Sequence, residues 1–575
     1  MELYSLSQIS KKEKLFYVIL TLIFIVLYAF YLPQDIMDID STQYAEITRE
    51  MVENHDYFKI RDNGRKYLDK PIMTFWILSF SFNIFGANNF AYRFPALLMA
   101  VISLIGIFKL AYLLYQKERK AWFAMLFYLS SPALFTMLTS PIIDIYLTTF
   151  VIFVFLFYYY GLLKNDRYFY LMYLFIGIGF ITKGPISLAL PLLAIGGNII
   201  ITRNFDILKR MHLLYGIIII SIPILFWSYL LYKDFGIFGP YFFLYLQSFG
   251  RFFSKIYDTG WNPFYFYYTF IYSILPFSLP FIIILFYKLK EIKKQYSNAE
   301  NIKTKIINIY NDLYKKDVVL YLWVFFILIL LSFSKFRLPQ YIFWLVPGAC
   351  IVAGNWLEEY LSKKNKTIIN SFYFIPTFLF ILLLYLPFYT GEQFTFLFYI
   401  YLFLILLILF FFYKTFDYSL IYTFFAFLLF YCYIISSLYP MLIKYQPASK
   451  IAQIIFKLEL EKNRNNNKIL YTYGIPFSHR SYAFYTKRIT RPYSLKKAQF
   501  INELKVEKHK FIVVQEIFFK SFENELFQYF GKDLKINILG KFPYYKVSKP
   551  SLYFFNNNKR EKMLKYVYLV EVLLN

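Results

Sequence analysis

The sequence has little cysteine, histidine and acid for its length. Its 575 residues include two cysteines, four histidines and 35 Asp and Glu residues, against 62 Lys and Arg residues. Both cysteines, Cys350 and Cys432, lie in apolar segments, so no disulfide framework is expected to hold the fold together. The sequence contains no Walker-type loop, dinucleotide fingerprint, Ser-His-Asp order or Cys/His metal spacing. Direct use of a nucleotide is therefore not supported.

The first 440 residues lack the polar spacing of a soluble domain and carry repeated apolar runs instead. Hydrophobic residues make up 59% of the chain and aromatic residues 24%, whereas soluble domains contain roughly 45–50% apolar residues. Runs of about 17–25 apolar residues can cross a bilayer as helices. About 13 such spans are predicted: Leu15–Leu32, Phe90–Tyr115, Ala121–Leu138, Ile142–Leu163, Tyr168–Ile181, Pro185–Ile201, Leu213–Tyr232, Pro263–Tyr287, Val318–Ser332, Gln340–Leu361, Ile368–Tyr389, Phe394–Tyr413 and Ser419–Leu438.

The distribution of basic residues among the short loops predicts the orientation. Lys and Arg gather in alternate loops, beginning with Lys11, Lys12 and Lys14, which places the N-terminus in the cytoplasm. The first apolar run has no small-residue cleavage site and is predicted to be an uncleaved helix. An odd number of spans places the C-terminal 135 residues on the outer face, although they carry 25 basic and 10 acidic residues. Long translocated domains largely escape the charge rule.

Two domains are expected, with residues 1–440 in the membrane and residues 441–575 outside it. Residues 33–88 would form the first outer loop with its juxtamembrane helices. The predicted fold class is an α-helical polytopic membrane protein with a small C-terminal α/β domain, which ends in an amphipathic segment at Met563–Leu574. The tail contains β-like runs at Ile469–Tyr473, Phe511–Gln515 and Ile536–Gly540, and helical patterns at Lys496–Val506 and Phe518–Phe530.

The first outer loop is acidic in an otherwise basic chain. Nine of the 35 acidic residues lie in Pro33–Lys70, together with six basic residues. Asp40 precedes a helical pattern, and Gln43 follows it at the spacing of a capping box. Asp40 is therefore predicted to cap this helix. A catalytic role is compatible with capping, because the start of a helix holds a carboxylate rigidly at the membrane surface.

Further charged residues are predicted on the same outer face. Asp144 lies near the outer start of an apolar helix, where an unpaired carboxylate is costly and indicates function. The basic residues on this face include Lys70, Lys183, Arg251 and Arg337. Carboxylates suit the deprotonation of a hydroxyl or an amine, and cations stabilise the charge that develops on a departing phosphate. A lysine beside the bilayer also commonly extends its ammonium to the headgroups, so Lys70 alone would indicate little.

A specific series of residues runs through the first outer loop and continues beyond it. It comprises Asp38-Ile39-Asp40-Ser41-Thr42-Gln43-Tyr44-Ala45-Glu46-Ile47, Asp56-Tyr57, Asn63-Gly64, Tyr67, Asp69-Lys70-Pro71, Phe75-Trp76, Phe85-Gly86, Arg93-Phe94-Pro95, Asp144, Thr182-Lys183-Gly184-Pro185 and Ser334-Lys335-Phe336-Arg337-Leu338-Pro339-Gln340-Tyr341. This series resembles the lipid A aminoarabinose transferases and their wider relatives, the bacterial protein-mannosyltransferase-like glycosyltransferases. The resemblance covers about the first 360 residues.

The resemblance implies a membrane fold of the GT-C type that uses polyprenyl-phosphate sugars. The family's essential carboxylate corresponds to Asp40. Lys70, Arg251 and Arg337 would contact the lipid phosphate, and Asp144 would support the acceptor site. The cavity would be lined by Tyr44, Tyr67, Asp69, Lys183 and Tyr341.

The chain departs from the family's pattern at several positions. Ser41 and Gln43 replace the Glu and Arg of its Asp-Glu-x-Arg-Tyr motif, and Asp69 replaces the Glu before Lys-Pro. Gln247 and Ser248 stand where close relatives carry a Glu-His pair. No outer-loop His takes the place of the His of this pair to hold the divalent metal that is possible in the family, so no cofactor is expected. These changes affect the expected sugar and acceptor more than the reaction class.

The sequence thus predicts an inverting, metal-independent hexosyl- or pentosyltransferase at the periplasmic face of the bacterial inner membrane. Asp40 would act as general base or acceptor orienter, while Lys70 and Arg251 neutralise the leaving phosphate. The acceptor could be lipid A, another glycan or a protein. Membrane lipids are expected partners, whereas nucleic acid is not, because the basic tail faces outward.

Two other classes of function stay open from the sequence. A lipid or glycan transporter or flippase would also need many spans and intramembrane charges. Transporters tend to contain internal repeats and broken helices near the midplane, and this sequence has no convincing repeat. An assembly scaffold that holds anionic lipid or glycan on the basic tail is the third alternative.

Overall fold

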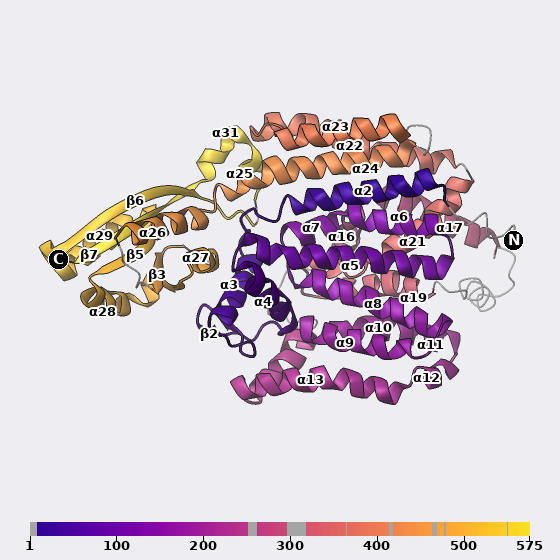
Figure 1. Ribbon diagram of the computed structural model, residues 1–575, viewed down its shortest axis with the longest axis horizontal. Helices are drawn as coiled ribbons and strands as arrows, with labels where there is room; N and C mark the ends of the chain where they lie inside the picture. Colours follow the sequence, from indigo (N-terminus) through magenta and orange to yellow (C-terminus); the bar gives the residue numbers. More distant parts are fainter. Residues whose placement is uncertain are drawn as a thin grey trace.

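The computed structural model describes residues 9–250, 262–295, 318–363, 365–412, 418–462, 468–475, 479–548 and 550–574. A long helical body carries a smaller sheet-containing domain at one end (Figure 1). The first outer loop, with its helices α3 (Asp40–Glu53) and α4 (Met73–Phe85), lies at the same end of the body (Figure 1). The predicted class, a helical membrane fold with a small C-terminal α/β domain, is confirmed. The domain boundary at residue 440 stays a prediction.

Each of the 13 predicted apolar runs contains a helix. The helices of the body are α2 (Lys11–Ala29), α5 (Asn89–Tyr115), α6 (Glu118–Ser130), α7 (Pro132–Thr139), α8 (Ile143–Leu163), α9 (Tyr168–Lys183), α10 (Ile186–Pro191), α11 (Gly197–Thr202), α13 (Leu213–Phe235), α16 (Tyr265–Ser273), α17 (Ser278–Gln295), α19 (Val318–Tyr321), α20 (Ile327–Ser332), α21 (Val346–Ser362), α22 (Lys366–Thr390), α23 (Phe396–Phe412), α24 (Tyr418–Tyr433) and α25 (Tyr439–Ile443). Five helical segments in the described part of the chain are long and apolar enough to cross a membrane, or seven if two bent helix pairs are included. The count of about 13 spans stays a prediction.

Local sequence explains where the helices near the outer end begin and stop. Ser131 caps α7 by accepting the N–H of Leu134 at 3.2 Å, and Pro132 fills the first helical position, where no donor is needed. This break bends α6 and α7 by 48° relative to each other. Gly184 ends α9 with a φ of +97°, which leaves Lys183 in the last helical turn.

The C-terminal domain is built on a five-stranded sheet in the order β4-β3-β5-β7-β6. The first three strands are parallel, and β7 joins β5 to β6 by antiparallel pairing. The strands are β3 (Ile469–Tyr473), β4 (Ile489–Pro492), β5 (His509–Gln515), β6 (Leu534–Tyr544) and β7 (Lys565–Leu574), and the helices of this region include α26 (Ala448–Lys462), α27 (His479–Thr486), α28 (Lys497–Glu507) and α29 (Glu516–Phe530).

Two strands differ from the sequence prediction. The amphipathic segment expected at Met563–Leu574 is the strand β7, and Val567, Leu569, Val570 and Val572 are fully buried within it. A strand that is buried on both faces does not alternate between apolar and polar residues. The two-residue period that identifies a strand is therefore missing from this segment of the sequence. The edge strand β4 was not predicted, because it has four residues and ends in Pro492.

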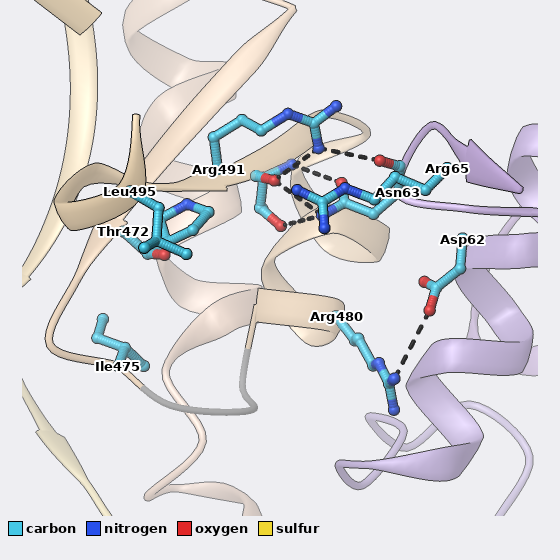
Figure 2. Close-up of a pocket in the computed structure, with 10 residues that line it drawn as sticks. Asp62, Asn63, Arg65, Thr472, Ile475, Arg480, Arg491 and Leu495 are labelled. Carbon is cyan, nitrogen blue, oxygen red and sulfur yellow. Dashed lines mark hydrogen bonds and ion pairs between the residues drawn. The ribbon is translucent and has the colours of Figure 1, made fainter. Parts of the chain in front are cut away.

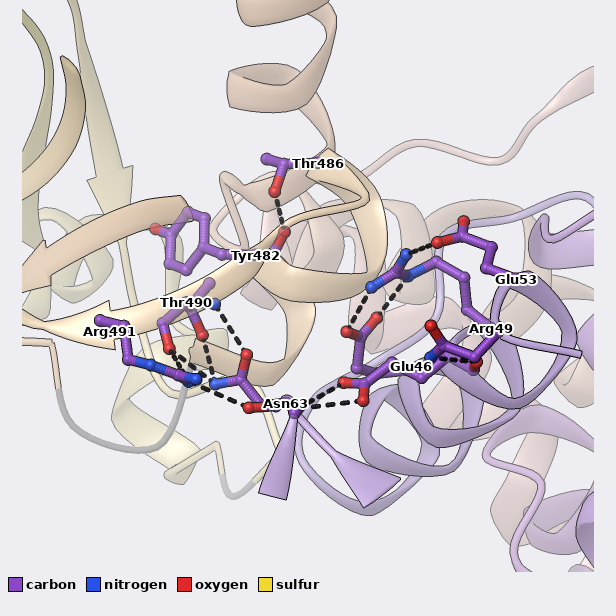
Figure 3. Close-up of polar contacts among 11 residues, drawn as sticks. Glu46, Arg49, Glu53, Asn63, Tyr482, Thr486, Thr490 and Arg491 are labelled. Atoms are coloured by element: carbon purple, nitrogen blue, oxygen red, sulfur yellow. Dashed lines mark hydrogen bonds and ion pairs between the residues drawn. The ribbon is translucent and has the colours of Figure 1, made fainter. Parts of the chain in front are cut away.

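A hairpin in the first outer loop joins α3 to the C-terminal domain. It consists of β1 (Arg61–Asp62) and β2 (Arg65–Lys66). At its tip the Asn63 side chain donates to the carbonyl of Thr490 in β4 at 2.8 Å and accepts the Thr490 N–H at 2.7 Å (Figures 2 and 3). On its inner side the Gly64 N–H donates to both carboxylate oxygens of Glu50 in α3 at 3.0 Å.

The buried polar face of α3 is satisfied internally. The fully buried Glu46 accepts from the Nε and Nη2 of Arg49 at 2.8 and 2.6 Å, and Arg49 also pairs with Glu53 (Figure 3). Burial raises the pKa of Glu46 to about 8, against the opposing effect of Arg49. Removing either partner would leave a buried charge unpaired, so this network holds α3 in a fixed orientation.

We expect Gly64→Ala to loosen the contact between the hairpin and the C-terminal domain. Gly64 has a φ of +75°, and an added Cβ would lie 3.3 Å from Ile489 Cδ1 and 3.5 Å from Arg491 Nη2. A side chain in this conformation costs roughly 1–2 kcal/mol. Trypsin cleavage at the hairpin should therefore accelerate by roughly 5–30-fold. Gly531→Ala is the control, because Gly531 also has a positive φ, of +57°, but has nothing within 4 Å of its added Cβ. Equal cleavage of the hairpin in the two variants would contradict the expected contact.

Candidate functional site

Asp40 occupies the first position of α3, and its side chain is exposed. The next residue fixes this position, because Ser41 Oγ donates to the carbonyl of Pro141 at 3.0 Å. Tyr92 Oη donates to the same carbonyl at 2.6 Å. The start of α3 is therefore attached to the loop that precedes α8, three residues before Asp144. A helix start also favours a carboxylate electrostatically.

The expected capping box is wrong. Ile39 is the N-cap of α3 and makes no side-chain cap hydrogen bond. Gln43 donates instead to Asp62 Oδ2 of the hairpin at 2.5 Å. Asp40 itself makes no hydrogen bond or ion pair within the described part of the chain, so its carboxylate is not committed to a structural contact there.

Asp144 belongs to a buried cluster formed by the ends of three segments. It lies in the first turn of α8 and pairs with Lys183 in the last turn of α9. The Nε1 of Trp344 donates to the same Asp144 oxygen at 2.9 Å. The Lys183 ammonium lies 4.7 Å from the Trp344 ring centroid and 5.5 Å from that of Tyr341. The carboxylate is thus held by one cation and one donor, and aromatic rings face that cation.

The charges of Asp40 and Asp144 both act on the buried Tyr44. Burial chiefly raises the pKa of the Tyr44 hydroxyl well above its ordinary value, and the charges of Asp40 and Asp144 raise it further. Burial likewise raises the pKa of Tyr67, with smaller contributions from Asp69 and Asp40. Both rings pack edge-on against Phe75, with centroid distances of 6.0 and 6.4 Å. Tyr44 and Tyr67, both selected from the sequence, therefore pack on the same ring, and the charge of Asp40 acts on both.

The segment 67–72 forms another side of the site. Asp69 is exposed and accepts from Gln247 Nε2 at 2.7 Å, which ties the first loop to the helical segment Phe242–Gly250. Lys70 follows it, with a half-buried side chain. Gln247 therefore makes a polar contact with Asp69. Close relatives in the family that the sequence resembles carry a Glu at this position.

Arg337 holds the loop that carries Tyr341. The buried Arg337 donates from Nε to the carbonyl of Ser334 at 3.3 Å and from Nη1 to that of Asn262 at 3.1 Å. Tyr341 lies in the short helix Pro339–Ile342 and stacks on Trp344 with a centroid distance of 5.5 Å. Arg251 lies outside the described residues. Roles in phosphate binding for Lys70, Arg251 and Arg337 stay predictions.

The described residues contain no group of three or more His, Cys, Asp or Glu side chains placed to hold a metal ion. Asp144 already binds Lys183 and Trp344. The described side chains therefore do not fit a metal centre.

Two residues beside the site were not selected from the sequence. Trp344 holds Asp144 across a separation of 200 residues, so the sequence offered no spacing signal for this contact. Asp38 accepts from Thr42 Oγ1 at 2.8 Å and from Ser481 Oγ of the C-terminal domain at 2.9 Å. Burial raises its pKa to about 7, although Thr42, Ser481 and Arg480 act in the opposite direction.

The raised pKa of Asp38 predicts that stability falls as the pH rises. An unfolded Asp titrates near pH 3.9, so the folded protein binds this proton more tightly than the unfolded chain does. The resulting stabilisation is full below about pH 4 and is lost as the pH passes through about 7. Between pH 5 and 8 the wild-type unfolding midpoint should therefore drop relative to that of Asp38→Asn. The measurement is thermal unfolding in detergent at each pH. If the midpoints of the two proteins changed with pH in the same way, the raised pKa of Asp38 would be contradicted.

Comparison with known proteins gives several sequence relatives. Residues 69–229 match the family described as dolichyl-phosphate-mannose-protein mannosyltransferase. An uncharacterized protein of Aquifex aeolicus is 26% identical over 78% of this chain and 81% of its own length. The undecaprenyl phosphate-alpha-4-amino-4-deoxy-L-arabinose arabinosyl transferase of Aeromonas hydrophila is 36% identical over 30% of this chain. The aligned segment spans 32% of that transferase.

The fold has a counterpart among solved structures. The crystal structure of ArnT from Cupriavidus metallidurans bound to undecaprenyl phosphate superposes with a TM-score of 0.69 and 16% sequence identity. The match covers 98% of each chain. The chain therefore has the GT-C fold, and its sequence is related to the aminoarabinose transferases.

Proposed function

We propose that this chain transfers a sugar from a polyprenyl-phosphate donor to an acceptor at the outer face of the membrane. The observation that carries the proposal is that the start of α3, which bears Asp40, is attached to the carbonyl of Pro141, three residues before Asp144, in a fold shared with an ArnT structure that binds undecaprenyl phosphate. The donor sugar would be a hexose or a pentose. The acceptor would be lipid A, another glycan or a protein.

Asp40 is the catalytic base in this proposal. Its exposed carboxylate takes the proton of an acceptor hydroxyl or amine while that group attacks the anomeric carbon. The bond between this carbon and the phosphate oxygen breaks in the same step, and polyprenyl phosphate leaves with the electron pair. Attack opposite the leaving group inverts the anomeric configuration. A general base typically contributes about 10²–10⁴-fold to such a rate.

Cations neutralise the departing phosphate. Lys70 and Arg251 are assigned this role, together with Arg337, because charge that develops in the transition state is best stabilised by pre-placed donors. Asp144 supports the acceptor and is positioned by Lys183 and Trp344. Tyr44, Tyr67, Asp69 and Tyr341 line the cavity around the reacting groups.

The orientation follows from the charge distribution of the loops. We place the chain in the bacterial inner membrane as a multi-pass protein with a cytoplasmic N-terminus. The site and the C-terminal domain, residues 441–575, then face the periplasm. Lipid-linked sugars that reach this face supply the donor, and surrounding membrane lipids are further partners.

Purified protein in liposomes separates transfer from transport. We expect labelled sugar to move from its polyprenyl-phosphate carrier onto a lipid A acceptor, in a reaction that EDTA does not change. A glycan fraction from the native cell envelope and a periplasmic protein extract serve as parallel acceptors. Movement of the intact labelled donor across the bilayer, with no label on any of the three acceptors, would contradict the proposal and indicate a flippase.

A further inference from the structure

One segment of the C-terminal domain returns to the membrane helices. Residues 545–564 follow β6, form the short helices α30 (Leu552–Phe555) and α31 (Asn557–Arg560), and lead into β7. In Figure 1, α31 lies beside the helical body, at the end that carries the C-terminal domain. Phe554 fixes the segment there, because it is fully buried in the same apolar cluster as the helices of the body.

Polar contacts place this segment at the end of α22. The Tyr389 hydroxyl, in the last turn of α22, donates to the carbonyl of Leu552 at 2.9 Å. The buried Arg560 donates from Nη2 to the carbonyl of Thr390, and its Nη1 lies 3.4 Å from Glu392 Oε1. Leu552 therefore lies level with the last turn of a helix that is long and apolar enough to cross a membrane.

The segment leaves apolar side chains exposed at this level. Leu552 is 78% exposed and Tyr553 62% exposed. At the same ends of the membrane helices, Phe388 of α22 and Phe396 of α23 are more exposed still. An apolar surface of this kind is unfavourable in water and marks a place where a membrane or a partner covers it. Lipid surrounds the ends of membrane helices, so lipid is the partner within reach.

The segment is also strongly basic. Residues 545–565 contain six basic residues and one acidic residue, Glu561. Two charged residues of the body lie beside them, since Glu392 pairs with Arg560 at 3.4 Å and Lys444 lies 3.9 Å from Glu392. Together these seven basic and two acidic residues give a net charge of +5. The buried Arg560 is committed to its partners, so the charge at the surface comes from lysines.

We propose that residues 551–562 dock the C-terminal domain on anionic phospholipids at the outer face of the membrane. Leu552 and Tyr553 enter the interface, where rings with one polar end are favoured. The exposed Lys559 and Lys562 bind phosphate groups of the lipids. The Lys559 ammonium lies 5.0 Å from the Tyr553 ring centroid, so a cation stands beside the ring that enters the interface. An apolar face bordered by lysines is typical of segments that lie in an interface.

This docking gives the C-terminal domain an attachment to the membrane besides its chain connection to α25. A protein partner would have to cover a surface that is level with the end of a membrane helix, whereas lipid needs no such access. Anionic headgroups also match the excess of lysines, and zwitterionic headgroups do not. The lipid is therefore selected by its charge as well as by its acyl chains.

Insertion is tested with the full-length protein in nanodiscs. The two native cysteines are buried, so a bimane label on Leu552→Cys reports on that position. Phospholipids with a nitroxide on the acyl chain should quench this label strongly and a label on Val506→Cys little. Val506 is the matched control, because it is 83% exposed and lies in α28, far from the helical body (Figure 1). Both positions are exposed, so neither substitution disturbs the core.

Headgroup selection is measured with the same label on Leu552→Cys. Nitroxide phosphatidylglycerol should reach half-maximal quenching at a lipid fraction roughly 5–30-fold lower than nitroxide phosphatidylcholine, the effect of one or two lysines near an anionic surface. Lys559→Gln with Lys562→Gln should remove this preference. Lys532→Gln with Lys535→Gln should keep it, because these two exposed lysines lie beside the C-terminus at the far end of the domain (Figure 1).

Equal quenching of the labels at positions 552 and 506 would overturn the insertion. Equal quenching by the two lipids, or loss of the preference in both lysine double variants, would overturn the anionic selection. Strong quenching at position 552 alone, with a preference that only the Lys559 and Lys562 substitutions remove, is the expected result. Sugar transfer enters neither readout, so this inference and the proposed function can fail separately.

Discussion

Replacing Asp40 by Asn should reduce sugar transfer by about 10²–10⁴-fold, the usual contribution of a general base. The amide has nearly the same shape but cannot accept the acceptor's proton. Folding should be unaffected, because the Asp40 side chain is exposed and makes no hydrogen bond or ion pair within the described ranges. The measurement is the initial rate of transfer from labelled polyprenyl-phosphate sugar, together with the thermal unfolding midpoint.

Asp56→Asn is the matched control for this prediction. Asp56 lies in the same acidic loop and pairs with Lys59 at 3.1 Å on the surface. Its loss removes one negative charge from the loop without touching the site, so the rate should change little. Transfer by Asp40→Asn at the wild-type rate would reject Asp40 as the base. An equal loss of rate in both variants would instead point to the overall charge of the loop.

Separating Asp144 from Lys183 should produce the largest loss of stability. Both side chains are largely buried, with exposed fractions of 4% and 14%. Removing one partner of a buried ion pair leaves the other charge uncompensated and costs roughly 3–5 kcal/mol. We therefore expect Asp144→Asn and Lys183→Met each to lower the unfolding midpoint strongly. The double variant should recover most of this loss, because Asn keeps an acceptor for Trp344 and neither charge remains.

The double variant also separates stability from function. If Asp144 supports the acceptor, the double variant should transfer sugar more slowly than the wild type even though its stability is restored. A double-mutant cycle on the exposed pair Asp56–Lys59 is the control, because surface pairs contribute only about 0–1 kcal/mol to stability. Additive losses in the Asp144–Lys183 cycle would show that the two side chains do not interact. Full transfer by the recovered double variant would remove Asp144 from the proposed site.

Much of the fold was predictable because bilayer spans have a strong local signal. Every predicted apolar run contains a helix, and the strand predicted at Ile469–Tyr473 has the same bounds in the structure. The missed strands β4 and β7 lack a local pattern, since one has four residues and the other is paired on both sides. Their place depends on partners that are distant in sequence.

The candidate site was predictable only where its chemistry is unusual for its surroundings. Asp40 and Asp144 were recognisable as acids in a basic, apolar chain, and the structure attaches the start of α3 to the loop just before Asp144. The contact of Trp344 with Asp144 spans 200 residues, so no spacing rule could indicate it. The capping box failed because Gln43 has a better partner, Asp62, which is supplied by the hairpin.

The docking of the first outer loop on the C-terminal domain sets the order in which the protein can mature. Asp38 and its partner Ser481 are 443 residues apart in sequence. At roughly 5–20 residues per second, the ribosome needs about 20–90 s to synthesise the chain between them. During that interval the acidic loop has already emerged without its partner. The nascent chain therefore completes this side of the site only near the end of its synthesis, and a ribosome that stops early releases a membrane-inserted protein whose acidic loop has nothing to dock against.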